Sequence, residues 1–300
     1  MQKPHNPILK QLGFSINDRV VIIHCDDIGM CQATIDAYAD LDANGAISSG
    51  SIMMPCSWSL AAVEYGVQNP QSDLGIHLTF NSEWKTYRWG PLSTRDPASG
   101  LLDPQGYFYT KFEEAQEHPQ PKAVELEIKS QIQFALDAGL HPTHVDTHML
   151  TLIHPTLLRT YLKTAYDFGL PAMIPRWNAE EWQIKGYDQE TAALLAEIVA
   201  EFEEQGYPML DYFTGLKLHD HTNRIEQAQK ALASLPAGLS HFYLHPSKDT
   251  PEARNISPDW RGRVADYEVF MDERMRVFIR SQGIHLVQYR TLLENFPKIT

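Results

Sequence analysis

The sequence predicts a one-domain α/β protein, built as a closed or nearly closed (β/α) barrel of seven to eight parallel strands. Short apolar runs alternate with longer amphipathic stretches, which is typical of strands and helices that alternate in a parallel sheet. The alternation continues through 300 residues with no internal linker, so we expect a single domain over residues 1–300. So many units in one chain favour a barrel over an open sheet.

Each element follows from the local pattern. The first strand is predicted at residues 20–24, where β-branched residues dominate. A helix is predicted at residues 122–138, because apolar residues recur every four positions from Val124 to Leu136 and Gly139 follows. By the same criteria, further strands are expected at residues 50–54, 74–80, 143–148, 172–175, 210–213, 241–244 and 285–289. Further helices are expected at residues 32–44, 58–67, 155–168, 189–204, 224–235 and 264–282.

A long aromatic-rich loop, residues 81–121, interrupts the alternation after the third strand. Connections of this length inside a domain are usually functional or disordered, and the aromatic content argues against disorder. One interpretation is a loop that only packs on the rest of the protein, and the other is a lid whose aromatic faces stack on a ring-shaped substrate. The aromatic residues are Trp84, Tyr87, Trp89, Tyr107, Phe108 and Tyr109. The first three are our candidates for substrate binding.

The composition excludes several classes of partner. The net charge is −13 and we find no Lys/Arg cluster, so nucleic acid is not an expected partner. Cys25, Cys31 and Cys56 are odd in number and lack C-x-x-C spacing, which fits free thiols in a reducing compartment. The first apolar run, residues 20–23, is far too short to cross a membrane or to form a signal core. We therefore expect a cytoplasmic protein with no membrane partner.

Ionisable residues gather where the predicted strands end. These residues are Asp26, Asp27, His77, His144, Asp146, His148, Arg176 and His245. The carboxyl ends of parallel barrel strands form one face, where active sites are built. His144, Asp146 and His148 alternate along one strand and share a side of it, where burial as structure alone is costly. A carboxylate with two imidazoles suits a catalytic divalent metal that keeps positions open for water and substrate.

Four motifs make the sequence recognisable in combination and order. They are residues 23–29 (Ile-His-Cys-Asp-Asp-Ile-Gly), 75–79 (Gly-Ile-His-Leu-Thr), 143–148 (Thr-His-Val-Asp-Thr-His) and 244–246 (Leu-His-Pro). The stretches 90–108 and 284–292 extend the match. With these motifs the sequence resembles the YdjC-like carbohydrate deacetylases, the family that includes chitooligosaccharide deacetylase, over nearly the whole chain.

The resemblance implies an irregular, TIM-like (β/α) barrel and metal-dependent removal of acetyl groups from N-acetylated sugars. By motif position it implies Asp27, His77 and His148 as the ligands of one divalent metal ion. It also implies Asp26 as the catalytic base and His245 as a further histidine of the site. Zinc suits such a ligand set best, with magnesium, manganese, cobalt and nickel as alternatives. The expected partner is a small carbohydrate.

The same assignment suggests a mechanism. The metal polarises the acetyl carbonyl and activates water, while Asp26 takes the proton of the attacking water. We expect His245 to protonate the departing amine and Arg176 to orient Asp26 or hold it ionised. Asp146 is expected to fix the tautomer of a ligand imidazole.

Two other functions are compatible with the residues. One is another metal-dependent hydrolase on the same barrel, a phosphoesterase or a cyclic-amide hydrolase, which usually needs further ligands or a second metal. The other is a non-catalytic sugar-binding protein with a structural metal, although such metals are usually fully ligated by protein. Metal stoichiometry and acetate release distinguish the three. The aromatic loop is also compatible with a homodimer.

Overall fold

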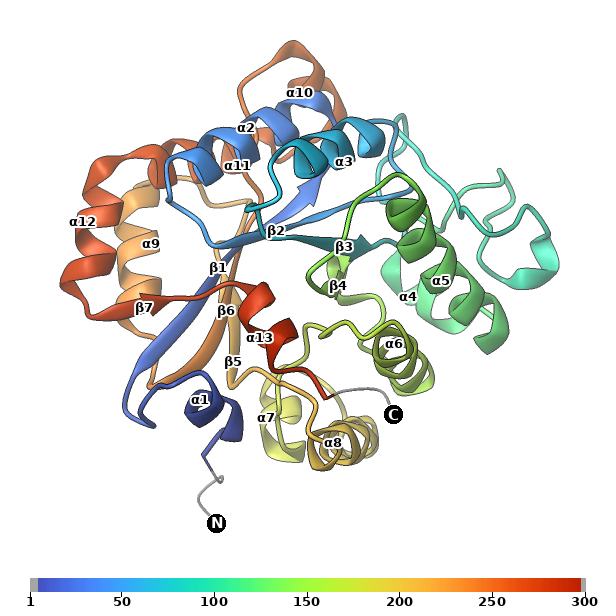
Figure 1. The fold of residues 1–300 in the computed structure, drawn as a ribbon. Helices are drawn as coiled ribbons and strands as arrows, with labels where there is room; N and C mark the ends of the chain where they lie inside the picture. Colours follow the sequence, from blue (N-terminus) through green and yellow to red (C-terminus); the bar gives the residue numbers. More distant parts are fainter. Residues whose placement is uncertain (1–4, 298–300) are drawn as a thin grey trace.

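The computed structural model describes residues 5–297 and has a curled sheet of parallel strands at its centre (Figure 1). Six strands follow the order β4-β3-β2-β1-β6-β5, and β7 pairs with β1 outside this path. The strands are β1 (Arg19–Ile28), β2 (Ser49–Ile52), β3 (Leu74–Leu78), β4 (Val145–Thr147), β5 (Tyr212–Gly215), β6 (Gly238–Leu244) and β7 (Ile284–Leu286). The predicted parallel α/β architecture is confirmed, in the form of a curled half-barrel.

The strand β1 is the centre of the sheet. Residues 20–25 are completely buried, as the β-branched run predicted. Residues 19–25 pair with β6 on one side. On the other side, residues 19–21 pair with β7 and residues 24–28 pair with β2. The strands β7 and β2 therefore share one edge of β1, with β7 along its first part and β2 along its last part.

The predicted strand 172–175 is present only as two isolated parallel bridges. Val145 pairs with Ala172, and Pro175 pairs with Leu210 just before β5. Proline has no amide hydrogen to donate to a ladder, so regular pairing cannot run through Pro175. The six-strand path itself ends at β4 and β5, and a complete ring of seven to eight strands stays a prediction.

Helices surround the sheet (Figure 1). They are α1 (Pro7–Gln11), α2 (Gln32–Ala43), α3 (Ser59–Gln68), α4 (Phe112–Glu117), α5 (Pro121–Asp137), α6 (Pro155–Asp167), α7 (Ala179–Ile184), α8 (Gln189–Glu204), α9 (Arg224–Ala233), α10 (Pro251–Ile256), α11 (Trp260–Met271), α12 (Glu273–Ser281) and α13 (Tyr289–Glu294). The predicted helix 264–282 is divided between α11 and α12, because Asp272 has an extended backbone and caps α12 through the amide of Arg274. The short helices went unpredicted, since five or six residues are too few to show a helical period.

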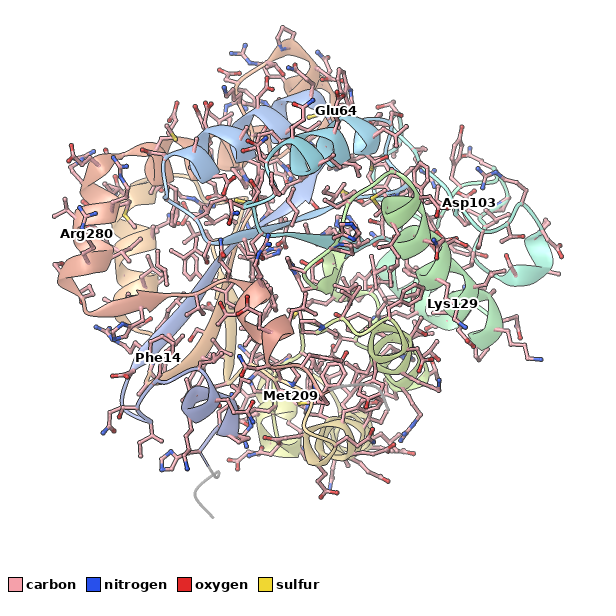
Figure 2. The ribbon with its side chains drawn as sticks, in the orientation of Figure 1. Phe14, Glu64, Asp103, Lys129, Met209 and Arg280 are labelled. Carbon is pink, nitrogen blue, oxygen red and sulfur yellow. The ribbon has the colours of Figure 1, made fainter. Side chains whose placement is uncertain are left out.

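The side chains follow this layering (Figure 2). Glu64 on α3 and Arg280 on α12 lie on the exposed outer side of their helices. Apolar side chains fill the space between helices and sheet in one large cluster, with a smaller cluster under α1 and α13. Within residues 5–297, none of the helices combines the length and the apolar character needed to cross a membrane.

The 81–121 loop is ordered on the molecule. It contains the 3-10 turn η1 (Pro97–Ser99) and the helix α4. The buried Glu127 of α5 accepts hydrogen bonds from the amides of Leu92 at 3.1 Å and Ser93 at 2.8 Å. A buried carboxylate needs such partners, so these contacts attach the loop to α5.

Candidate active site and metal centre

The end of β1 brings two neighbouring carboxylates into one cavity. Consecutive residues of a regular strand point to opposite faces. Here the register against β2 shifts between Cys25 and Ile28, and Asp27 has a φ of 61°, in the left-handed region. Asp26 and Asp27 consequently line the same cavity. Such backbone strain is typical of functional sites.

This cavity lies at the carboxyl ends of the strands and has a volume of about 390 Å³. That size is within the range of small-molecule sites. Its wall combines ionisable side chains with aromatic and aliphatic ones. The lining residues are Asp26, Asp27, Glu83, Trp84, Phe112, Asp146, Thr147, His148, Met149, Leu150, Met173, Phe213, Leu218, His241, Tyr243, His245, Asp259 and Arg263.

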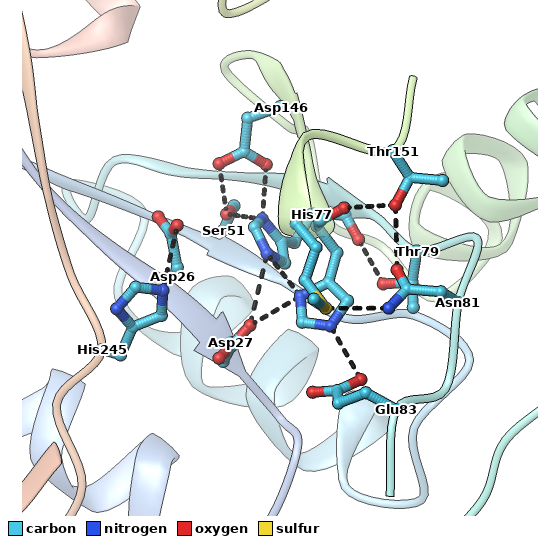
Figure 3. Close-up of polar contacts among 12 residues, drawn as sticks. Asp26, Asp27, Ser51, His77, Thr79, Asn81, Glu83, Asp146, Thr151 and His245 are labelled. Atoms are coloured by element: carbon cyan, nitrogen blue, oxygen red, sulfur yellow. Dashed lines mark hydrogen bonds and ion pairs between the residues drawn. The ribbon is translucent and has the colours of Figure 1, made fainter. Parts of the chain in front are cut away.

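Three of the predicted residues, Asp27, His77 and His148, come together, and Asp27 and His148 line the cavity (Figure 3 labels Asp27 and His77). Asp27 Oδ1 lies 3.3 Å from His77 Nε2 and 3.1 Å from His148 Nδ1. The two nitrogens are 3.2 Å apart. All three side chains are buried, and Asp27 Oδ1 has no hydrogen-bond partner within residues 5–297.

This triangle fits a divalent metal ion. Ligand atoms held at about 2.1 Å in a tetrahedral site lie about 3.4 Å from one another, close to the separations found here. Asp27 Oδ1 is buried and faces the two imidazole nitrogens, so a cation among the three atoms would stabilise its charge when the imidazoles are neutral. Three other groups could also hold an ion, but their carboxylates already have hydrogen-bond partners, His24 for Asp26 and both His77 and Ser51 for Asp146. The groups are His24–Asp26–His241, His24–His144–Asp146 and Asp26–His77–Asp146.

The turn after β4 positions His148. The strand was expected to continue through this residue, but it ends at Thr147 and His148 begins the 3-10 turn η2 (His148–Leu150). Met149 and Leu150 both have positive φ, at 50° and 56°. Thr151 Oγ1 lies 2.8 Å from the His148 carbonyl oxygen and supports the turn. Both apolar side chains of the turn are exposed at the mouth of the cavity.

Carboxylates contact both imidazoles on the side away from the triangle. His77 Nδ1 lies 2.9 Å from Asp146 Oδ1. Asp146 was expected to contact one of the two imidazoles, and His77 is the one it contacts. His148 Nε2 lies 3.2 Å from Glu83 Oε2. Burial lowers the pKa of His148, but the charges of Glu83 and Asp27 outweigh it and raise this pKa to about 9. A carboxylate in this place fixes the tautomer of a metal-binding histidine. Glu83 lies in the long loop, three residues after the predicted strand 74–80, so its position near a strand end was a signal that the sequence reasoning missed.

Arg263 of α11 is the cation beside the aspartate pair. Its Nη1 donates to Asp27 Oδ2 at 2.6 Å, and its Nε donates to Asp259 Oδ1 at 2.8 Å. Burial raises the pKa of Asp27, but the charges of Arg263 and His148 hold it well below its usual range. Sequence reasoning missed Arg263 because it belongs to a helix and to none of the motifs.

Arg176, expected to orient Asp26, has other partners. Its Nε donates to Glu203 at 2.5 Å and its Nη1 to Asp211 at 3.4 Å. In the described part of the chain it is not among the residues that line the cavity. Arg176 follows the irregular 172–175 segment, and its side chain reaches Glu203 of α8. The guanidinium that contacts Asp27 belongs to Arg263, and the expected role of Arg176 beside Asp26 stays a prediction.

Asp26 lies between two histidines. Its Oδ1 is 2.8 Å from His24 Nδ1, and its Oδ2 is 3.6 Å from His245 Nε2 (Figure 3 shows the second contact). Asp26 and His245 keep 14% and 19% of their side-chain surface exposed, so both can be reached from the cavity. The amide of His245 donates to the buried Asp266 at 3.1 Å, which fixes the end of β6.

Of the three aromatic candidates, Trp84 lines the cavity. Trp89 is 4% exposed and donates from Nε1 to the Asn81 carbonyl, and the Tyr87 hydroxyl donates to the Met30 carbonyl. Both rings pack against Trp84, with centroids 6.4 Å away for Tyr87 and 5.6 Å for Trp89. Among residues 5–297, the cavity wall thus includes Trp84 directly, with Tyr87 and Trp89 behind it.

Comparison with known proteins decides the family. Residues 20–281 match the model of the family described as YdjC-like protein. The chain belongs to the YdjC-like family. A protein of Thermus thermophilus named carbohydrate deacetylase is 32% identical over 262 residues, which are 87% of this chain and 89% of that protein. A protein of the same name from Brevibacillus brevis is 27% identical and covers 91% of this chain and 99% of that protein. The resemblance seen in the sequence is confirmed.

The fold of this YdjC-like protein is shared with a solved structure. The crystal structure of a protein from Enterococcus faecalis V583 superposes with a TM-score of 0.74 at 20% identity. The match covers 92% of this chain and 99% of that chain. At this identity the similarity shows the fold alone.

Proposed function

We propose that the protein is a metal-dependent carbohydrate N-deacetylase, a hydrolase that removes the acetyl group from an N-acetylated sugar or oligosaccharide. One observation carries the proposal: the facing ligand atoms of Asp27, His77 and His148 come together where Asp27 and His148 line a cavity that the separate carboxylate of Asp26 also lines. The family and the relatives named carbohydrate deacetylase support the substrate class.

Asp27, His77 and His148 would hold one divalent ion, of which Zn²⁺ suits the donor set best. When bound, the ion polarises the acetyl carbonyl and lowers the pKa of water at an open position. Asp146 and Glu83 orient the two imidazoles from behind. Magnesium, manganese, cobalt and nickel are the alternatives.

Asp26 is the general base in this proposal. Its Oδ1 is engaged by His24, so Oδ2 is the oxygen that accepts the proton of the attacking water. Proton transfer requires that oxygen to come within about 3 Å of the water. Asp27 is held separately by Arg263, so the two neighbouring carboxylates have different partners and different roles.

His245 is the general acid. The 3.6 Å between its Nε2 and Asp26 Oδ2 is longer than a hydrogen bond, which leaves both atoms available to substrate. His245 donates a proton to the departing amine nitrogen, because an amine leaves far more readily than an amide anion.

The sugar contacts the mixed apolar part of the wall. Trp84 presents its ring to the cavity, and Met149 and Leu150 lie at the mouth. Tyr87 and Trp89 hold Trp84 in place by ring packing. An aromatic face in this position binds the apolar face of a pyranose ring.

We also propose that the 172–175 segment completes the wall of an irregular TIM-like barrel. Its bridges to Val145 on one side and Leu210 on the other support this, because they lie between the two ends of the strand path. The whole chain then acts as one domain in the cytoplasm.

Acetate release tests the function. The purified protein, loaded with Zn²⁺, is incubated with an N-acetylated disaccharide, and acetate and bound metal are measured. We expect acetate release, loss of release with a chelator, and one metal per chain. Absence of acetate from any N-acetylated sugar would overturn the proposal. Two metals per chain with hydrolysis of a phosphoester or a cyclic amide would favour the other hydrolases.

A further inference from the structure

Behind Asp26, two buried histidines continue into the interior of the sheet. We propose that His24 and His144 form a hydrogen-bonded pair that positions the Asp26 carboxylate, with the His24 Nδ1 hydrogen held on Oδ1 so that Oδ2 is left for the reaction. Both are therefore positioning residues. The inference rests on the proposed role of Asp26 as the base.

The distances form an unbroken chain. His24 Nδ1 lies 2.8 Å from Asp26 Oδ1, and His24 Nε2 lies 2.9 Å from His144 Nε2. His144 Nδ1 lies 2.9 Å from Thr143 Oγ1. His24 and His144 are both completely buried, so bulk water does not compete for these bonds.

The chemistry of the groups orders the hydrogens. A carboxylate oxygen accepts, so the ring nitrogen of His24 that faces Asp26 must donate. Only one hydrogen can lie between the two Nε2 atoms. Burial holds the pKa of His144 well below its usual range, so His144 is neutral. His24 Nδ1 therefore donates to Asp26 Oδ1, whichever of the two rings holds the hydrogen between the Nε2 atoms.

Packing fixes the rings in this arrangement. The His144 ring stacks on Tyr289, with centroids 3.9 Å apart and planes 12° apart. His24 lies against His241, whose Nδ1 is 2.8 Å from the Tyr289 hydroxyl. A Cβ atom at Gly75 would come within 2.5 Å of the His144 ring. Glycine is therefore required at this position of β3 for His144 to occupy its place.

The consequence is a base whose carboxylate cannot rotate freely. Fixing Oδ1 leaves Oδ2 facing His245 across 3.6 Å. Preorganised groups raise the rate of the chemical step more than they improve substrate binding. Loss of the pair should thus lower kcat, while KM and metal binding should change little.

Matched variants at His144 test the pair in the Zn²⁺-loaded protein. His144→Leu removes the hydrogen-bond partner of His24 Nε2, whereas His144→Gln places an amide group, which can donate or accept, near the position of Nε2. We expect His144→Leu to lower kcat about tenfold to a hundredfold, with KM unchanged and one metal per chain, and His144→Gln to recover most of the loss. His285→Asn on β7, away from the pair, is the control with unchanged kcat.

Three results would overturn the inference: wild-type kcat in His144→Leu, equal losses in the leucine and glutamine variants, or loss of metal along with kcat in both. Equal losses would mean that the ring acts by packing alone.

Tautomers provide a readout that does not depend on activity. Imidazole ¹⁵N chemical shifts of the wild-type protein should show a hydrogen on His24 Nδ1. A His24 ring without a hydrogen on Nδ1 would contradict the pair. If the wild-type protein releases no acetate, the proposed function fails, and the tautomers still decide whether the pair exists.

Discussion

Replacing Arg263 by methionine should destabilise the metal-free protein much more than the metal-loaded one. The guanidinium is 4% exposed and contacts Asp27 at 2.6 Å and Asp259 at 2.8 Å. Removing one member of a buried ion pair costs about 3–5 kcal/mol, because a buried charge is left uncompensated. His148, with a pKa of about 9, stays beside Asp27 as a cation at neutral pH. We therefore expect the free energy of unfolding of the metal-free protein to fall by about 3 kcal/mol, the lower end of that range.

Denaturation with and without metal measures this effect. The free energy of unfolding of Arg263→Met is compared with that of the wild type by urea titration, first in a chelator and then with saturating Zn²⁺. Since a bound cation would compensate Asp27, the loss should shrink by at least half when Zn²⁺ is present. The matched control is Arg159→Met, which breaks an exposed pair with Glu201 and should cost about 1 kcal/mol or less in both conditions.

Two results would refute this reasoning. An Arg263→Met variant as stable as the wild type in the chelator would mean that the buried pair contributes nothing to folding. An equal loss with and without Zn²⁺ would mean that no cation binds at Asp27, which would also count against the proposed metal centre.

Further predictions concern the same cavity. Alanine at each proposed ligand should abolish metal binding and acetate release together, as measured by elemental analysis and an acetate assay; the variants are Asp27→Ala, His77→Ala and His148→Ala. Asp26→Asn should keep the metal and lose acetate release, and near-wild-type turnover would exclude Asp26 as the base. Glu83→Gln should weaken Zn²⁺ affinity about 10- to 100-fold, because the His148 imidazole loses its carboxylate partner. Zn²⁺ affinity should rise from pH 6 to pH 8 with proton release in calorimetry, since the metal needs neutral His148 and the free protein holds its pKa at about 9; pH-independent affinity would contradict this. Trp84→Ala should raise KM for the sugar more than it lowers kcat.

Sequence pattern was sufficient for the framework of the fold. The β-branched run of β1 reflects a strand that is buried on both faces. The four-residue period of α5 reflects a helix that is buried on one face. Both kinds of burial require apolar residues at regular positions, so the sequence pattern predicts them. The segment 172–175 was predicted as a strand because it has the same apolar character. Whether it forms a ladder depends on neighbours from β4 and β5, and the structure shows only isolated bridges.

The motifs also located the site, because the carboxyl ends of parallel strands meet at one side of a sheet. Asp27, His77 and His148 each follow or end a strand, and they lie together as expected. Arg176 follows the 172–175 segment as well, yet its side chain contacts Glu203 and Asp211. Position along the chain predicts which end of the sheet a residue occupies, but not the direction of a long side chain.

The partners of these residues were decided by tertiary structure alone. Arg263 reaches Asp27 across 236 positions, and His144 reaches His24 across 120. Such pairs leave no periodic signal, since they arise when separate elements pack side by side. The sequence therefore predicted which residues come together at the proposed metal centre, while the folded chain determined that Arg263 contacts Asp27 and that His24 and His144 lie behind Asp26.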